Sequence, residues 1–210
     1  MTDPHASDQA RLKMRTFPTA RTLVDAVTPL SVRRLERMRD LSLVLVGSVL
    51  IAACAKIRIG GPIPFTMQSW AVILLGAALG RRRGTLAVIA YLLEGAVGLP
   101  VFAGPGAGPA YLMGSTSGFL AGFVPAAYVV GRLAERRWDR RYVTAVVAVG
   151  LGDAIILAMG IGWLATFVGM RHAIDVGLRP LWMADLLKVF LAAAALPGAW
   201  RLMGRSAGNS

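Results

Sequence analysis

The sequence is dominated by apolar runs that approach the length of a membrane span. An α-helix needs about 20 mostly apolar residues to cross roughly 30 Å of hydrocarbon. Six such runs, separated by Pro/Gly-rich or Arg-rich breaks, are Leu41–Ile57, Thr66–Gly80, Thr85–Gly98, Ser115–Leu133, Tyr142–Trp163 and Leu181–Trp200. With 56% hydrophobic and 16% charged residues and a mean hydropathy of +0.60, the chain fits a lipid-embedded protein better than a soluble domain. We therefore predict an all-α, polytopic membrane protein built as a six-helix transmembrane bundle.

The second and third runs are short for full spans. Only the stretch Arg81–Arg82–Arg83–Gly84 separates them, which leaves room for a tight turn and little else. We therefore predict that these two runs form a helical hairpin.

Positive charge is distributed unevenly between alternate sides of the predicted spans. If the N-terminus is inside, all but five of the 23 Lys and Arg residues lie on the inner side. The exceptions are Lys56, Arg58, Arg171 and Arg179 on the outer side and Lys188 within a run. Cytoplasmic loops carry the excess of basic residues, so both termini are predicted to face the cytoplasm. The basic clusters form no continuous patch, and therefore they do not indicate a nucleic-acid partner.

The chain divides into three predicted parts. Residues 1–40 are a basic cytoplasmic tail, residues 41–205 are the transmembrane ligand-binding domain, and residues 206–210 are a short cytoplasmic tail. Within the first tail, Leu30, Val32, Leu35 and Met38 are spaced for a short amphipathic helix on the membrane surface. A disordered tail fits this stretch equally well.

Two loops predicted on the outer side, residues 58–65 and 99–114, combine apolar residues with repeated Gly and Pro. Irregular backbone at membrane depth survives only where protein or a cavity shelters it. We expect shaped connections here, and a lid over a pocket is favoured over an idle linker.

Ionisable residues inside the runs indicate a site, because each costs about 2.5 to 3.5 kcal/mol at the centre of a span. They are Glu94, Asp153, Asp185 and Lys188. Asp185 and Lys188 are three residues apart, which puts them on one helical face where they can pair. A self-neutralising pair without a ligand is the alternative.

Aromatic residues near Glu94 suit the wall of a pocket. Glu94 follows Tyr91 by nearly one helical turn, and Phe102 and Trp70 lie near the same predicted outer end. Together these rings could enclose a small cyclic ligand. Each one alone also fits packing or an interfacial anchor.

Neutral polar residues at the starts of runs could complete such a site. Gln68 and Thr116, with Ser115 and Ser117 beside the latter, are candidates for hydrogen bonds to a ligand. Helix capping explains the same residues equally well.

Several enzyme and cofactor motifs fail on inspection. Gly104–Gly108 is rich in glycine, but no Lys–Ser/Thr follows, so it is no nucleotide-binding loop. Gly114–Gly118 resembles a serine-hydrolase elbow, yet its central residue is Thr116, and His172 falls in a predicted loop. With two His and one Cys, Cys54, no metal or cofactor is expected.

Ser48 and Ala52 are spaced four residues apart in the first run. Small residues at this spacing let helices approach closely in lipid. They could serve internal packing or the docking of a partner subunit, and the spacing does not separate the two.

Several stretches together resemble the BioY family, the substrate-binding S components of energy-coupling factor biotin transporters. The similar stretches are Lys56–Ile59, Pro62–Gln68, Tyr91–Ala103, Gly118–Phe123 and Ala184–Lys188. The resemblance runs from about Leu41 to Trp200 and implies a multi-pass protein of the cell membrane that takes up biotin from outside. It also implies a transmembrane coupling subunit and two ATP-binding subunits as partners, with no ATPase in this chain. A homo-oligomer remains open.

The resemblance assigns roles to some residues. Asp185 and Lys188 match the late Asp and Lys of the family's motif, and the resemblance implies that this region takes part in ligand binding. As a hypothesis, Asp185 accepts a ureido N–H, while Lys188 neutralises a carboxylate, either that of Asp185 or that of biotin. Ser48–Ala52 falls where S components show an Ala-x-x-x-Ala docking motif, from which the Ser departs. Asp153 has no counterpart in the resemblance.

Three rival functions remain to be tested. They are an S component for another vitamin such as thiamine, an intramembrane serine hydrolase that uses Ser115 or Ser117 with His172, and a structural assembly factor.

Overall fold

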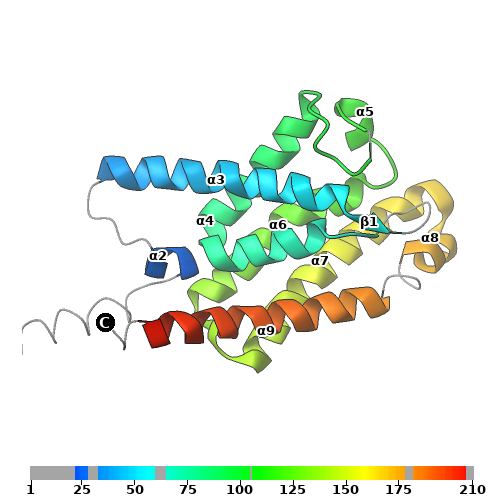
Figure 1. Ribbon diagram of the computed structural model, residues 1–210. Coiled ribbons are helices and arrows are strands. Elements are labelled where there is room, and N and C mark those ends of the chain that lie inside the picture. The colour runs from blue at the N-terminus through cyan, green and yellow to red at the C-terminus, as the bar shows by residue number, and fades with distance from the viewer. Residues whose placement is uncertain (1–21, 28–32, 60–64, 105, 178–181, 207–210) are drawn as a thin grey trace, which may run out of the picture.

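The computed structural model describes residues 22–27, 33–59, 65–104, 106–177 and 182–206, and its framework is helical (Figure 1). The long helices are α3 (Arg33–Lys56), α4 (Gln68–Ala96), α6 (Ser117–Glu135), α7 (Tyr142–Val168) and α9 (Trp182–Ser206). The short ones are α2 (Leu23–Val27), α5 (Pro109–Leu112), the 3-10 helix η1 (Trp138–Arg140) and α8 (Met170–Gly177). In the described ranges the strands are β1 (Arg58–Ile59) and β2 (Phe65–Thr66), which pair antiparallel. The predicted helical class is confirmed, with this short ladder as an addition.

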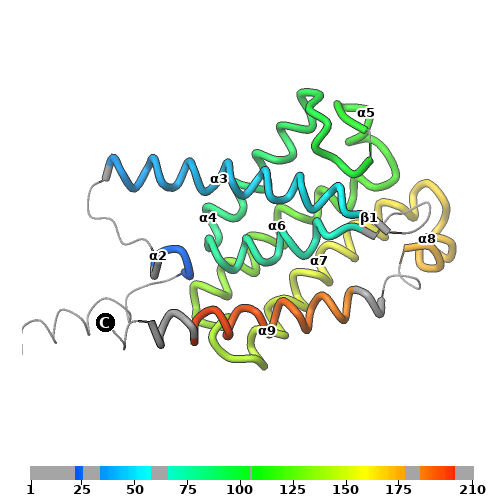
Figure 2. Tube along the Cα trace, viewed as in Figure 1, coloured from blue at the N-terminus to red at the C-terminus, as the bar shows by residue number. Residues whose placement is uncertain are grey.

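Helix α4 reverses direction at Gly80. This residue has φ 82° and ψ 174°, a non-helical conformation that glycine adopts at little steric cost. The second half of α4 then packs back on the first, so closely that a Cβ at Gly84 would lie 2.8 Å from the Cα of Gly76. Figure 2 shows the trace turning back within α4. The predicted hairpin is confirmed, although its break lies one residue before the three arginines, which are themselves helical.

Helix α6 packs between α4 and α7, and small residues permit its close approach to both. A Cβ at Gly131 would lie 2.5 Å from the backbone nitrogen of Arg81 in α4, and one at Gly122 would lie 3.0 Å from the Cα of Ile156 in α7. Small residues at helix crossings are typical of proteins packed in lipid. In the view of Figure 1, α4, α6 and α7 lie between α3 and α9.

The outward faces of the long helices are apolar. The exposed large hydrophobic residues include Leu45, Val46, Val49 and Leu50 on α3 and Leu187, Phe190 and Leu191 on α9. Within the described ranges, three helical stretches are long and apolar enough to cross a membrane: Arg34–Lys56, Ser117–Glu135 and Tyr142–Val168. Since apolar surface of this extent is stable in lipid and unfavourable in water, these features fit a membrane protein. The count of six spans and the orientation of the termini stay predictions.

The segment before the first predicted span is partly structured. Helix α3 begins at Arg33, before the predicted start at Leu41. Asp25 of α2 forms an ion pair with Arg83 at 2.7 Å, and Arg83 also pairs with Asp40 at 2.9 Å. These contacts hold α2 against the turn of the α4 hairpin, so the N-terminal boundary predicted at residue 41 does not mark the start of packed structure. Residues 1–21 and 28–32, which include most of the predicted tail, lie outside the described residues.

Candidate ligand-binding site

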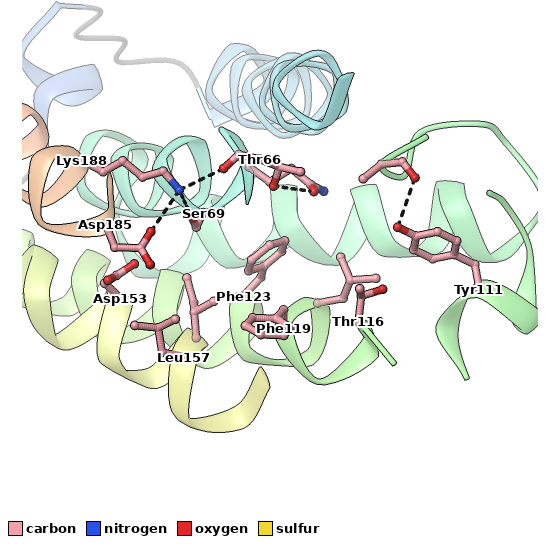
Figure 3. A pocket seen from close by; sticks show the side chains of 14 residues that line it. Thr66, Ser69, Tyr111, Thr116, Phe119, Phe123, Asp153, Leu157, Asp185 and Lys188 are labelled. Carbon is pink, nitrogen blue, oxygen red and sulfur yellow. Dashed lines mark hydrogen bonds and ion pairs between the residues drawn. The ribbon is translucent and has the colours of Figure 1, made fainter. Parts of the chain in front are cut away.

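A cavity lies between the first half of α4, α6, α7 and α9, next to the end of β2 (Figure 3). Its lining combines charged, neutral polar and apolar side chains. The residues are Thr66, Gln68, Ser69, Ala103, Tyr111, Thr116, Phe119, Leu120, Phe123, Asp153, Ile156, Leu157, Asp185 and Lys188. Such a lining suits a small molecule that has both an apolar body and hydrogen-bonding groups.

Asp185 and Lys188 form a buried ion pair on α9 that faces this cavity. Lys188 Nζ lies 3.2 Å from Asp185 Oδ1, and each side chain is 9% exposed. The ammonium also donates to Ser69 Oγ and to the backbone carbonyl oxygen of Thr66, both over 3.0 Å. Buried charges are tolerated when they are paired and hydrogen-bonded, which explains how α9 carries two of them. The pairing predicted from the spacing is confirmed.

Asp153 brings a second carboxylate to the cavity from the neighbouring helix α7. Its residue is 9% exposed, and Figure 3 shows it beside Asp185. The sequence marked Asp153 only as an acid inside an apolar run and gave it no role. Its place in the cavity could not be predicted, because the register between α7 and α9 depends on packing.

The apolar walls come from α6 and α7. Phe119 and Phe123 are four residues apart and therefore share one face of α6, opposite Ile156 and Leu157 of α7. Gly160 makes room for the Phe119 ring, since a Cβ there would lie 2.2 Å from a ring carbon. The sequence did not predict this wall, because apolar residues fill every run and give no signal of which ones face a cavity.

Gln68 lines the cavity, and Tyr91 holds it from behind. Gln68 Nε2 donates to the hydroxyl of Tyr91 over 2.5 Å, and Thr66 Oγ1 donates to Gln68 Oε1 over 3.1 Å. Tyr91 is fully buried and packs edge-on against Phe102, with ring centroids 5.6 Å apart. Tyr91 therefore orients Gln68 and is not itself part of the lining.

A further aromatic residue, Tyr111, reaches the cavity from the loop region around α5. Phe102 is fully buried and stacks on Tyr111, with ring centroids 4.8 Å apart and planes at 15°. The hydroxyl of Tyr111 donates to the carbonyl oxygen of Ala103 over 3.2 Å. Sequence reasoning missed Tyr111. Gly106 makes room for this ring, since a Cβ there would lie 2.1 Å from it, but only the structure shows that contact.

The family model of the BioY family matches residues 23–205. The chain belongs to the BioY family. It is 43% identical to the biotin transporter BioY of Thermotoga maritima, across 74% of this chain and 92% of that protein. It is 36% identical to the probable biotin transporter BioY of Pyrococcus horikoshii, across 81% of this chain and 99% of that protein. The BioY resemblance predicted from the sequence is confirmed.

The BioY fold of this chain is similar to that of a solved protein. The crystal structure of the S-component for biotin from an ECF-type ABC transporter superposes with a TM-score of 0.71. The similarity covers 81% of this chain and 95% of the other, at 20% sequence identity. The two proteins therefore share a fold.

Two of the residues predicted for the BioY site lie away from the cavity. Glu94 accepts a hydrogen bond from the hydroxyl of Ser48 in α3 over 2.8 Å, and it is absent from the lining. Trp70 packs on the hydrophobic core, and its buried Nε1 has no hydrogen-bond partner in the described ranges. The structure thus brings Gln68, Thr116, Asp185 and Lys188 together, puts Tyr91 and Phe102 behind them, and leaves Glu94 and Trp70 outside.

The proposed docking pair on α3 is split between two environments. Ser48 is fully buried and its hydroxyl is engaged by Glu94 and by the backbone oxygen of Leu45. Ala52 is half-buried against the core. The geometry favours internal packing for Ser48, the alternative that the spacing had left open.

The serine-hydrolase alternative finds no support in the arrangement of its residues. The hydroxyl of Ser117 donates to the carbonyl oxygens of Gly114 and Tyr111 at 2.8 and 3.3 Å, and Ser115 is exposed. His172, predicted in a loop, lies exposed on the short helix α8. These side chains are not arranged as a nucleophile and its base. In the part of the chain that the structure describes, no group of His, Cys, Asp and Glu could hold a metal ion.

Proposed function

We propose that this chain captures biotin at the membrane and delivers it across as the substrate-binding S component of an energy-coupling factor transporter. Family membership and the biotin transporters at 43% and 36% identity support this function. On this proposal the chain is a transport subunit and not an enzyme.

The single observation that carries the proposal is the position of the buried Asp185–Lys188 pair at one side of an apolar slot. Biotin combines a fused ring, a ureido group with two N–H donors and a carbonyl, and a valerate carboxylate. A site for it needs an apolar slot, partners for the ureido group and a compensating cation. Phe119 and Phe123 supply the slot, Lys188 is the cation, and Gln68 and Asp185 offer hydrogen-bonding groups.

Other residues have supporting roles in the proposal. Thr116 lies at the far side of the lining from the ion pair and offers a neutral hydroxyl. Tyr91 and Phe102 do not line the cavity. Tyr91 orients Gln68 by a hydrogen bond, and Phe102 orients Tyr111 by ring stacking. Lys188 either stays with Asp185 when biotin is bound or moves to the ligand carboxylate, and both arrangements keep its charge compensated.

The membrane arrangement and the partners also belong to the proposal. We infer six spans with both termini in the cytoplasm, because the two halves of α4 and α9 add to the three apolar helices and because the basic residues gather on one side. A transmembrane coupling subunit and two ATP-binding subunits would drive release by reorienting the whole bundle. The exposed apolar face of α3 around Leu45 and Val49 offers surface for lipid or for the coupling subunit.

Isothermal titration of the detergent-purified protein with biotin tests the function. We expect the wild type to bind, and Asp185→Asn and Lys188→Met to weaken binding at least tenfold. Asp175→Asn, on the exposed helix α8, is the matched control and should bind as the wild type does. If both cavity variants keep full affinity, the assignment of the pair is wrong.

Two further results would reject the proposed function itself. Folded wild-type protein that ignores biotin but binds another vitamin in a competition panel would assign it to a different substrate. Biotin-stimulated ATP hydrolysis by the isolated chain would contradict the dependence on partner subunits.

A further inference from the structure

Asp153 stands out among the ionisable groups of the cavity because none of the described residues forms a hydrogen bond or an ion pair with it. It lies within the apolar helix α7, its residue is 91% buried, and its carboxylate faces the cavity. The described residues give this carboxylate no hydrogen bond and no ion pair. Its oxygen atoms are not among the fully buried, unpartnered atoms of the described ranges, which agrees with a carboxyl group that opens to the cavity. An acid within an apolar helix that opens to a cavity is a candidate for contact with a ligand.

The charge of Lys188 acts on Asp153, but the described hydrogen bonds of its ammonium go to other acceptors. They are Asp185 Oδ1, Ser69 Oγ and the carbonyl oxygen of Thr66, at 3.0 to 3.2 Å. Asp185 and Lys188 are the charged side chains that act on Asp153. The described lining therefore holds two carboxyl groups and one ammonium group.

The second carboxyl group, that of Asp153, affects which ligand groups can approach. A ligand carboxylate near Asp153 would meet a like charge in a poorly solvated place, whereas an N–H donor would form a charge-assisted hydrogen bond. The apolar side chains Ile156 and Leu157, which follow on the same helix, offer no competing donor.

We propose that Asp153 is a ligand-binding residue that accepts a hydrogen bond from a ureido N–H and makes the cavity selective for ligands with N–H donors. This inference rests on the proposed function and extends the binding site from α9 to α7. On this proposal Asp185 forms its ion pair with Lys188, while the carboxyl group of Asp153 contacts the ligand.

The test compares two ligands that differ in their N–H donors. In protonated 2-iminobiotin, a guanidinium replaces the ureido group. It adds a positive charge and has two further N–H donors in place of the carbonyl oxygen. Titration calorimetry of wild type and Asp153→Asn should show biotin affinity falling on the order of tenfold to a hundredfold in the variant, since the amide oxygen can still accept but the charge that strengthens the hydrogen bond is lost. The affinity for 2-iminobiotin at a pH where it is protonated should fall by a clearly larger factor.

Three other results would each contradict a different part of the inference. Equal factors for both ligands would reject a direct contact and leave Asp153 as a residue that only positions its neighbours. Unchanged biotin affinity in Asp153→Asn would reject the inference while leaving the proposed function intact. Wild-type protein that binds neither ligand would reject the proposed function first and this inference with it.

A second measurement needs no variant protein. The two biotin derivatives methylated on one or the other ureido nitrogen each lack one N–H donor. We expect one of them to bind wild-type protein at least tenfold more weakly than biotin. If both derivatives bind as tightly as biotin, neither ureido N–H forms a hydrogen bond that contributes to affinity, and the inference is overturned.

Discussion

The ammonium nitrogen of Lys56 lies 2.9 Å from the carbonyl oxygen of Phe102. The same ammonium donates to the carbonyl oxygens of Pro100 and Gly104 at 2.6 and 3.1 Å. Lys56 is the last residue of α3, so these bonds fasten the loop after α4 to the end of another helix. Because Phe102 stacks on Tyr111, which lines the cavity, the loop connects Lys56 to the ligand site.

Replacing Lys56 with Met should loosen this loop and weaken biotin binding by roughly five- to tenfold, mainly through faster dissociation. Hydrogen bonds from a charged donor contribute about 1.5 to 3 kcal/mol when buried, and solvent reduces that value at an exposed residue such as Lys56. Stopped-flow or surface-plasmon measurements of dissociation would give the rate. Arg171→Met, at another exposed basic residue, is the control. If biotin dissociates from Lys56→Met and from Arg171→Met at the same rate, the loop does not affect binding at the site.

The hydrogen bond between Ser48 and Glu94 should contribute to the stability of the protein and not to its affinity for biotin. Ser48→Ala removes a hydrogen bond to a carboxylate between α3 and α4, and it should destabilise the protein by about 1 to 2 kcal/mol. Glu94→Gln keeps an acceptor for the Ser48 hydroxyl and should change stability less. Neither variant should alter biotin affinity by more than about twofold, because neither residue lines the cavity. A large loss of affinity in Glu94→Gln would instead support the ligand role that the sequence suggested for Glu94.

The close contact within the α4 hairpin predicts that Gly84 cannot be enlarged. Its Cβ would lie 2.8 Å from the Cα of Gly76, and backbone cannot move aside as a flexible side chain can. Gly84→Ala should therefore destabilise the protein by about 1 to 3 kcal/mol, seen as a lower midpoint of thermal unfolding in detergent. Gly150→Ala on α7 is the matched control, because nothing lies within 4 Å of a Cβ there. Since alanine also favours the helix, this control should be neutral or slightly stabilising.

The hairpin also illustrates what sequence patterns can predict. The run Arg81–Arg82–Arg83 interrupts apolar sequence, and glycines flank it. The residue types of this short segment are therefore enough to predict that the chain reverses there. The pairing of Asp185 with Lys188 was predictable for the same reason, since a spacing of three residues fixes both on one face of a helix. Family membership followed from several short motifs spread over the chain.

Long-range register is what the sequence could not provide. Glu94 and Ser48 belong to different helices, and only the packing of α3 on α4 shows that they meet each other and not the cavity. Asp153 and Tyr111 reach the cavity for a similar reason, since their positions depend on how α7 and the loop region around α5 pack on α6. In a membrane helix every face is apolar, so the periodicity that distinguishes inner from outer faces in a soluble helix carries little information.

A pH-dependent prediction concerns Asp139 in η1, at the opposite end of the bundle from the cavity. Asp139 is 2% exposed, and burial raises the pKa of its carboxyl above the ordinary value. The indole Nε1 of Trp200 in α9 donates to Asp139 Oδ2 over 2.5 Å, which favours the ionised form and limits the increase. Arg140 lies over the Trp200 ring, 4.1 Å from its centroid, and closes the cluster.

Trp200→Phe removes the indole donor but keeps a ring beneath Arg140. Because the folded-state pKa of Asp139 is raised, the contribution of this residue to stability is fully present below the unfolded-state pKa and is lost as the pH rises through the folded-state value. Without the indole the folded-state pKa rises further, so the ionised carboxylate becomes more costly. We therefore expect Trp200→Phe to destabilise the protein by about 1.5 to 3 kcal/mol at pH 8 and by less at acidic pH, where Asp139 is protonated.

Thermal unfolding in detergent at pH 5 and pH 8 measures this difference. The variant Asp139→Asn supplies the control, because an amide cannot ionise but can still accept from the indole. In an Asp139→Asn background, adding Trp200→Phe should give the same loss of stability at both pH values. If the pH dependence of the Trp200→Phe effect persists in that background, then another titrating group, and not Asp139, is coupled to the indole, and the buried carboxylate has no part in holding η1 to α9.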